Sequence, residues 1–275
     1  MSEIKTDTIE IELFGQRIPL AYFERPGDKD TLLYLHGLGS SKADFLSANV
    51  PDGLPGYSLV AFDFPGCGDS SYPDGATLGI DDLVETTRLF LDARGIDRVT
   101  LIGHSFGGLT GLLFAHRYPE RVMRFINVEG NVASEDCGMF SRAVVARRSE
   151  GSPEYLMERF NAEFAASEKS GFDTYAESFS DNVTGRAFVD YCVSIVRYSD
   201  DEPLLEYFIQ LAVPRLFIYG AENALLSYIP RLAREGIRVE EIPDSNHFPT
   251  YSNPSLYYGA IRDFLGSTER VATGE

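Results

Sequence analysis

A serine at position 105 stands in a setting that suits a nucleophile. Residues Val99–Gly108 read VTLIGHSFGG, an apolar run followed by a Gly-x-Ser-x-Gly pattern, and a helix-like stretch follows from Leu109 to His116. This order predicts a strand, a sharp turn and a helix, with Ser105 on the turn. Gly103 and Gly107 lack a Cβ, so the turn can be tight and the helix can pack close to the strand. We expect a strained backbone that holds the Ser105 hydroxyl above the sheet edge.

The segments around this turn alternate between apolar runs and helical patterns. Two runs that alternate around Gly15 predict an N-terminal β-hairpin over Ile9–Leu13 and Arg17–Phe23. Further strands are predicted at Thr31–Leu35, Ser58–Phe62, Val99–Ile102, Val122–Val128, Val213–Tyr219 and Ile237–Ile242. Helices are predicted over Ile80–Ala93, between the last two strands, and over Pro254–Leu265. Strands that alternate with helices indicate an α/β fold with a parallel sheet covered on both faces.

One segment breaks this alternation. Residues 131–211 contain helical patterns, the best over Arg142–Arg148, Pro153–Ser167 and Ala187–Tyr198, and no convincing strand. The segment is too long for a connecting loop. We therefore predict a core formed by residues 1–130 and 212–275, with residues 131–211 inserted as a helical cap. The segment is rich in aromatic side chains, and a cap laid over a sheet edge forms a concave apolar site.

The composition restricts the classes of partner. The 275 residues carry 42 acidic and 24 basic side chains, a formal net charge of −18, which disfavours nucleic acids and anionic membranes. No apolar stretch is long enough to cross a bilayer and the N-terminal residues have no apolar signal core, so we expect a cytoplasmic protein. The three cysteines are few and widely spaced, which predicts free thiols and no zinc site. No dinucleotide or Walker motif is present, and we expect no cofactor and no metal.

Four motifs follow one another along the chain. They are LHGLG at residues 35–39, DFPGCGDS at 63–70, GHSFGG at 103–108 and SNHF at 245–248. With these motifs in this order, the chain from Ile9 to Leu265 resembles the α/β-hydrolase superfamily. The resemblance implies the α/β-hydrolase fold, a mostly parallel sheet flanked by helices with an inserted helical cap. It also implies a serine, an acid and a histidine as catalytic triad, in that chain order.

Four histidines are candidates for the base that activates the serine: His36, His104, His116 and His247. A serine hydroxyl is a poor nucleophile until a base takes its proton, which histidine can do near neutral pH. His36 lies in a His-Gly turn that its ring would brace. The ring of His104 should point away from the turn that carries Ser105, called the elbow here, and His116 lies well into a helix. Only His247 follows a late strand, where the family places its base. The resemblance also implies an oxyanion hole formed by the backbone N–H groups of Leu38 and Phe106.

The acid of the triad is the residue at which this chain departs from most relatives. They carry an aspartate three residues after the glycine that ends the strand here written LFIYG, and this chain has Asn223. A neutral amide cannot stabilise an imidazolium as a carboxylate does. Glu129 ends the preceding predicted strand, and the haloalkane dehalogenases of this superfamily carry their catalytic glutamate after that strand. We expect Glu129 to be the acid, with Glu222 as the alternative.

These features predict a serine hydrolase that cleaves a small or medium apolar carboxylic ester through an acyl-enzyme, in the manner of a carboxylesterase. The substrate would be a small molecule, and the cap would shape its acyl pocket. A lactonase or thioesterase would use the same triad, and a ligand receptor on this fold would keep the residues with little turnover. Dehalogenase chemistry is disfavoured because position 105 is not an aspartate and the chain has no tryptophan. The natural substrate and the oligomeric state stay open.

Overall fold

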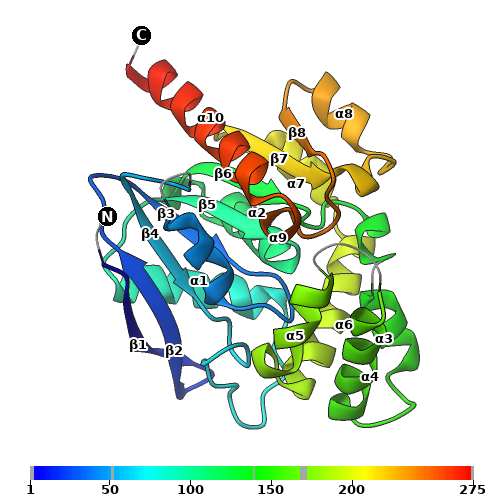
Figure 1. Ribbon diagram of the computed structural model, residues 1–275. Coiled ribbons are helices and arrows are strands. Elements are labelled where there is room, and N and C mark those ends of the chain that lie inside the picture. The colour runs from blue at the N-terminus through cyan, green and yellow to red at the C-terminus, as the bar shows by residue number, and fades with distance from the viewer. Residues whose placement is uncertain (1–2, 51–52, 139, 168–171, 274–275) are drawn as a thin grey trace.

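The computed structural model describes residues 3–50, 53–138, 140–167 and 172–273. Eight strands form one sheet in the order β1-β2-β4-β3-β5-β6-β7-β8, with helices on both sides (Figure 1). The strands are β1 (Lys5–Leu13), β2 (Gln16–Arg25), β3 (Lys29–Leu35), β4 (Tyr57–Phe62), β5 (Val99–His104), β6 (Val122–Val128), β7 (Arg215–Gly220) and β8 (Arg238–Ile242). Strand β2 runs antiparallel to β1 and β4, and the other neighbouring pairs are parallel. The predicted α/β fold with a mostly parallel sheet is confirmed.

Helices connect these strands and follow the last of them. They are α1 (Ile80–Ala93), α2 (Phe106–Arg117), α3 (Ser141–Arg147), α4 (Pro153–Ala165), α5 (Phe172–Asn182), α6 (Gly185–Asp201), α7 (Leu204–Gln210), α8 (Ile229–Arg234), α9 (Pro249–Ser252) and α10 (Pro254–Thr273). Short 3-10 helices are η1 (Lys42–Ala48), η2 (Pro119–Arg121), η3 (Ser134–Gly138) and η4 (Ala221–Asn223).

Two apolar cores follow from the alternation of side chains along the strands. In β3, Leu33 faces the core that includes α1 and α2, and Leu32 faces the core that includes η1 and α10. Successive side chains of a strand point to opposite faces, so a strand buried on both faces is a continuous apolar run. This is why the runs read from the sequence correspond to β3, β4, β5 and β6.

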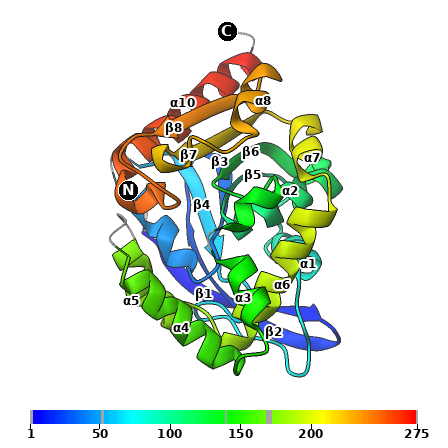
Figure 2. The ribbon, with the colours of Figure 1, turned by 90° about the vertical axis from the view of Figure 1, so that its right-hand side faces the viewer.

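Helices fill the chain between β6 and β7 in the described residues. Helices α3 to α6 gather on one side of the sheet (Figures 1 and 2). Helix α7 returns to α2, and its Phe208 contacts the sheet residues Phe125 and Phe217 at ring-centroid distances of 5.8 and 6.0 Å. The sequence indicated α3, α4 and α6, and it did not single out α5 or α7. Helix α10 continues to Thr273, beyond its predicted end at Leu265.

The helical segment is tied to the loop that follows β4. Residues Cys67 and Val183 form an isolated antiparallel bridge. The N–H of Gly68 donates to the Asn182 carbonyl at 2.9 Å, and the N–H of Thr184 donates to the Gly66 carbonyl at 2.9 Å. The loop after β4 therefore fixes the end of α5 relative to the sheet.

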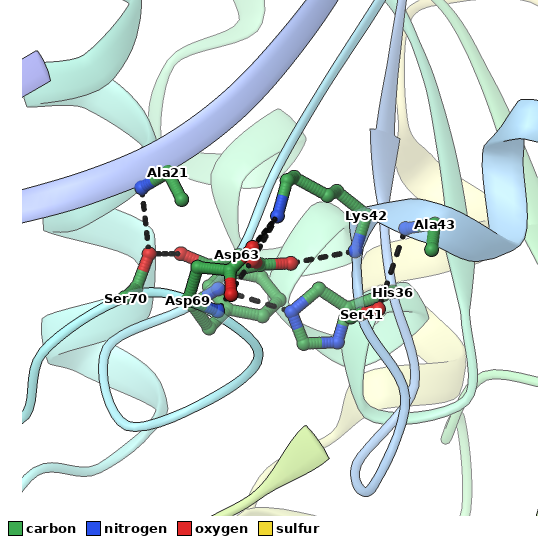
Figure 3. Close-up of polar contacts among 9 residues, drawn as sticks. Ala21, His36, Ser41, Lys42, Ala43, Asp63, Asp69 and Ser70 are labelled. Atoms are coloured by element: carbon green, nitrogen blue, oxygen red, sulfur yellow. Dashed lines mark hydrogen bonds and ion pairs between the residues drawn. The ribbon is translucent and has the colours of Figure 1, made fainter. Parts of the chain in front are cut away.

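A buried ion pair holds this same loop against the segment after β3 (Figure 3). The carboxylate of Asp63, which is fully buried, accepts from the backbone N–H of Lys42 at 2.6 Å and from its Nζ at 2.7 Å. Lys42 Nζ also donates to the exposed Asp69 at 2.7 Å. Burial opposes the charge of Lys42, but the two carboxylates prevail and raise its pKa. The pair therefore links the loop after β3 to the loop after β4.

The cysteines bear on disulfide bonds, and the helices bear on membrane spans. Cys67, Cys137 and Cys192 are buried free thiols. In the described part of the chain, no helix combines the length and the apolar character that a membrane span requires.

Candidate active site

The candidate residues gather where parallel strands end. Strand β3 lies between β4 and β5, so the strand order reverses there, and open α/β sheets bind ligands in the crevice at such a point. Ser105 follows β5 directly, Glu129 follows β6 directly, and His247 lies on the loop after β8. The sheet thus brings residues far apart in the sequence to one edge.

Ser105 lies on a tight and strained turn. Its φ of 53° and ψ of −122° lie outside the regions that L-residues favour. The N–H of Ser105 donates to the Val128 carbonyl at 2.9 Å, which anchors the turn to β6. A Cβ on Gly103 would lie 2.5 Å from the Gly107 carbonyl oxygen, and one on Gly107 would lie 2.2 Å from that of Leu35. Both glycines are therefore required for the close approach of strand and helix that the sequence predicted.

His247 lies between Ser105, to which it is hydrogen-bonded, and Glu129. His247 Nε2 lies 2.9 Å from Ser105 Oγ, and His247 Nδ1 lies 3.5 Å from Glu129 Oε2. The imidazole side chain is 15% exposed and the carboxylate 4%, so water screens the pair weakly. The distance of 3.5 Å between His247 Nδ1 and Glu129 Oε2 is long for a hydrogen bond and lies within the range of an ion pair.

Two donors from β7 and η4 hold the carboxylate of Glu129. Gly220 N–H donates to Oε1 at 2.6 Å, and Asn223 Nδ2 donates to Oε2 at 2.9 Å. Glu129 has a φ of 53°, a conformation that is strained for a glutamate. Asn223, three residues after the glycine that ends β7, thus donates to the carboxylate that lies beside the histidine. The Glu222 side chain is exposed, and its backbone N–H donates to the Ser245 carbonyl at 3.1 Å.

The other histidines have structural partners. His36 Nε2 accepts from Phe64 N–H at 3.0 Å, and its Nδ1 faces the Gly37 carbonyl at 2.8 Å, so the ring braces the loops as expected. His104 Nε2 lies 2.8 Å from the His247 carbonyl, and burial lowers the pKa of His104 to about 3. His104 is therefore neutral near pH 7 and supports the backbone of His247. His116 stacks on Tyr207 at a centroid distance of 4.1 Å.

The two backbone groups expected to bind an oxyanion lie on segments next to Ser105, one at the start of α2 and one after β3. Phe106 is the first residue of α2, and N–H groups in the first turn of a helix have no acceptor within the helix. Leu38 lies in a turn from Gly37 to Ser40, and a Cβ on Gly37 would lie 3.6 Å from Ser105 Cβ.

A cavity of about 270 Å³ opens beside the histidine. His247, Glu129, Asn223 and Asn246 line it from the core, and Glu135, Asp136, Gly138, Phe172 and Leu226 complete its lining. Desolvation raises the pKa of Asp136 to about 6, against hydrogen bonds that lower it. The sequence predicted an apolar concavity, but this cavity combines apolar and carboxylate side chains. The described residues include no group of three or more His, Cys, Asp or Glu side chains arranged to hold a metal ion.

Comparison with known proteins gives the same family. A family model described as the alpha/beta hydrolase fold matches residues 30–254. The chain belongs to the α/β-hydrolase fold family. A putative esterase/lipase of Mycoplasma genitalium is 22% identical over 250 residues, covering 88% of this chain and 91% of that protein.

Two solved structures show how far the fold extends along this α/β-hydrolase. A thermophilic esterase from Thermogutta terrifontis superposes with a TM-score of 0.75 at 19% identity, covering 95% of this chain and 98% of that one. A structure reported with carboxylesterases of Nitrososphaera gargenis superposes with a TM-score of 0.76 at 16% identity, covering 95% and 99%. At these identities the likeness concerns the fold.

Proposed function

We propose that this α/β-hydrolase is a serine hydrolase that cleaves carboxylic esters through an acyl-enzyme, as a carboxylesterase does. The observation that carries this proposal is the 2.9 Å contact between His247 Nε2 and Ser105 Oγ, with the serine on a strained elbow. A nucleophile within hydrogen-bond reach of a base, which is in turn oriented by a third group, is the arrangement that acyl transfer requires.

Each residue has a defined role in the proposed mechanism. Ser105 Oγ attacks the ester carbonyl carbon while His247 Nε2 takes its proton. The oxyanion that forms accepts hydrogen bonds from the N–H groups of Leu38 and Phe106. His247 returns the proton to the leaving alcohol, and the acyl group stays on Ser105. Water then attacks the acyl carbon while His247 Nε2 takes its proton, and His247 returns that proton to Ser105 Oγ as the bond between the serine and the acyl group breaks and the acid leaves.

Glu129 is the proposed acid of the triad. Its carboxylate stabilises the imidazolium that forms when His247 holds the serine proton, and it orients the ring. Gly220 and Asn223 keep that carboxylate in place, with donors at 2.6 and 2.9 Å. Asn223 would thus support a glutamate that has taken the place of the usual acid.

The proposed substrate is a small or medium ester with an uncharged acyl part. Residues 131–211 would form the cap over the site. Carboxylates in the cavity beside His247 disfavour an anionic group there. A lactone or thioester fits the same chemistry.

Turnover of p-nitrophenyl acetate and butyrate tests the proposal. We expect many turnovers from the wild type and a fall of about 10³-fold or more for Ser105→Ala. Ser267→Ala on α10, which removes a hydroxyl remote from the site, is the matched control and should keep full activity. Release of less than one equivalent of p-nitrophenol by the wild type would instead favour a ligand receptor on this fold.

A further inference from the structure

Glu129 has a backbone conformation that a glutamate rarely adopts. Its φ is 53°, whereas L-residues prefer negative values, because a positive φ brings Cβ too close to the following carbonyl oxygen. The value of φ also sets the direction of Cβ relative to the preceding peptide. A return to a negative φ would rotate Cβ about the N–Cα bond and carry the carboxylate away from His247, whose Nδ1 lies 3.5 Å from Glu129 Oε2. The position of the carboxylate therefore depends on the groups that hold this φ.

The peptide before Glu129 is held at both ends. Its carbonyl, that of Val128, accepts from Ser105 N–H at 2.9 Å, and its N–H donates to the Ile218 carbonyl at 2.9 Å. These two bonds join the end of β6 to the elbow after β5 and to β7. They fix the peptide plane from which the N–Cα bond of Glu129 starts, but they do not restrict rotation about that bond.

The peptide after Glu129 is held by the side chain of Asn127. Gly130 N–H donates to Asn127 Oδ1 at 2.8 Å, so the amide closes a turn over the two residues between them. Asn127 is 0% exposed, and a Cβ on Gly130 or on Gly108 of α2 would come within 2.2 or 2.6 Å of its Oδ1. With the peptides on both sides of Glu129 held, their relative orientation, and so the positive φ, is maintained.

Packing alone does not account for an asparagine at position 127. Its Nδ2 is buried and has no hydrogen-bond partner in the described part of the chain. A buried donor without an acceptor costs free energy, which an apolar side chain in the strand would avoid. The part of the side chain that makes a hydrogen bond is Oδ1, and that bond holds the peptide next to the proposed acid.

We propose that Asn127 is a positioning residue for the acid of the triad, acting through the Gly130 peptide on the φ of Glu129. The inference rests on the proposed function, in which Glu129 is that acid. Gly220 and Asn223 hold the carboxylate oxygens, whereas Asn127 holds the backbone from which the carboxylate extends. A carboxylate that is aligned in advance needs no rearrangement when the imidazolium forms.

The test is Asn127→Ala, which removes the acceptor, with folding checked by circular dichroism. We expect kcat for p-nitrophenyl butyrate to fall about tenfold, because the carboxylate loses part of its alignment with the imidazolium. The loss should be smaller than that of Glu129→Gln, since Gly220 and Asn223 still hold the carboxylate oxygens. KM should stay within about twofold, because the acid acts on the transition state and not on the bound substrate.

A double variant shows whether Asn127 acts through Glu129. In the Glu129→Gln background no carboxylate is left to position, so Asn127→Ala should lower kcat further by less than about twofold. A loss of about tenfold in both backgrounds would overturn the proposal, because Asn127 would then act on the site by another route.

Thr100→Ala is the matched control. Thr100 lies near the start of β5, at the opposite end of the strand from Ser105, and is 0% exposed. Its Oγ1 accepts from Arg124 Nη1 at 3.3 Å, so the change removes a buried acceptor from the same sheet without touching a residue of the triad. We expect kcat and KM to stay at the wild-type values. Equal kcat for Thr100→Ala and Asn127→Ala would contradict the role of Asn127.

Failure of the proposed function would look different. If the wild type neither turns over p-nitrophenyl butyrate nor takes a fluorophosphonate on Ser105, the function itself is wrong. If it does both and Asn127→Ala matches Thr100→Ala, only the positioning role is wrong. Should Asn127→Ala not fold, Asn127→Ser leaves less empty space and places its hydroxyl oxygen where the asparagine has Cγ, one bond short of the contact with Gly130. The same loss of about tenfold is then expected, and wild-type kcat would count against the proposal.

Discussion

Glu129 shows how one residue can depend on contacts that are distant in sequence. Its neighbours Gly220 and Asn223 come from another strand end, and the histidine beside it comes from a third. The sequence placed Glu129 at a strand end and left Glu222 as an alternative. Only the fold shows which carboxylate lies near the histidine, because that depends on the order of β6, β7 and β8.

Exchange of each glutamate for glutamine separates the two candidates. Glu129→Gln keeps the shape and removes the charge, so we expect kcat to fall by about 10²–10⁴-fold. Glu222→Gln, on the exposed surface of η4, should stay close to the wild type. Both are measured on one p-nitrophenyl ester, with folding checked by circular dichroism. A large loss of kcat in Glu222→Gln, with the kcat of Glu129→Gln close to that of the wild type, would instead identify Glu222, which follows β7, as the acid.

The lowered pKa of His104 leads to a prediction about how the stability of the fold depends on pH. An ordinary histidine takes up its proton near pH 6.5, but burial lowers the pKa of His104 to about 3. Between these values the unfolded chain binds the proton and the folded chain does not, so stability falls as the pH falls through this window. At pH 5 the loss is about 2 kcal/mol, and at pH 7 it is negligible.

Urea unfolding of His104→Gln checks this sign. Glutamine keeps a donor for the His247 carbonyl but does not titrate. From pH 7 to pH 5 the wild type should lose about 2 kcal/mol more of unfolding free energy than the variant. Parallel losses in both proteins would show that His104 is not the group responsible.

At the scale of elements, the loops after β3 and β4 are joined by a charge pair. Lys42→Met would leave Asp63 as a buried carboxylate without its cation, at a cost of about 3–5 kcal/mol. Asp69→Asn removes the other partner of Lys42, whose side chain is 79% exposed, and should cost no more than about 1 kcal/mol. Thermal denaturation of both variants measures the difference. A similar small shift in both would mean that the pair does not brace the loops.

The elements that the sequence predicted are those with a strong local pattern. Strands β3 to β7 are apolar runs buried on both faces, and α1 has the predicted bounds Ile80–Ala93. Helix α5 was overlooked, although its buried residues Phe172, Tyr175, Ala176 and Phe179 follow the helical spacing. A pattern in sequence gives a helix one apolar face. It does not say that the face covers the turn of Leu38, which is a tertiary contact.

At the scale of the whole molecule, the excess of acidic residues affects which substrates reach the site. The net charge of −18 sets up a negative potential, and carboxylates line the cavity beside His247. We expect kcat/KM for p-nitrophenyl hemisuccinate, an anionic ester, to lie well below that for the neutral butyrate at low salt. The ratio should rise severalfold as the salt concentration increases from about 0.01 to 0.15 M, because screening shortens the field to about 8 Å. A ratio independent of salt would exclude this effect.

Covalent labelling tests the central claim, a serine at position 105 activated by His247 and Glu129. A fluorophosphonate forms a bond to an activated serine and loses fluoride, so intact mass and peptide mapping report the labelled residue. We predict a single label on Ser105, none on Ser105→Ala, and labelling at least about 10²-fold slower in His247→Ala and Glu129→Gln. A label that persists in folded Ser105→Ala, or a rate that does not change in His247→Ala, would contradict the proposed mechanism.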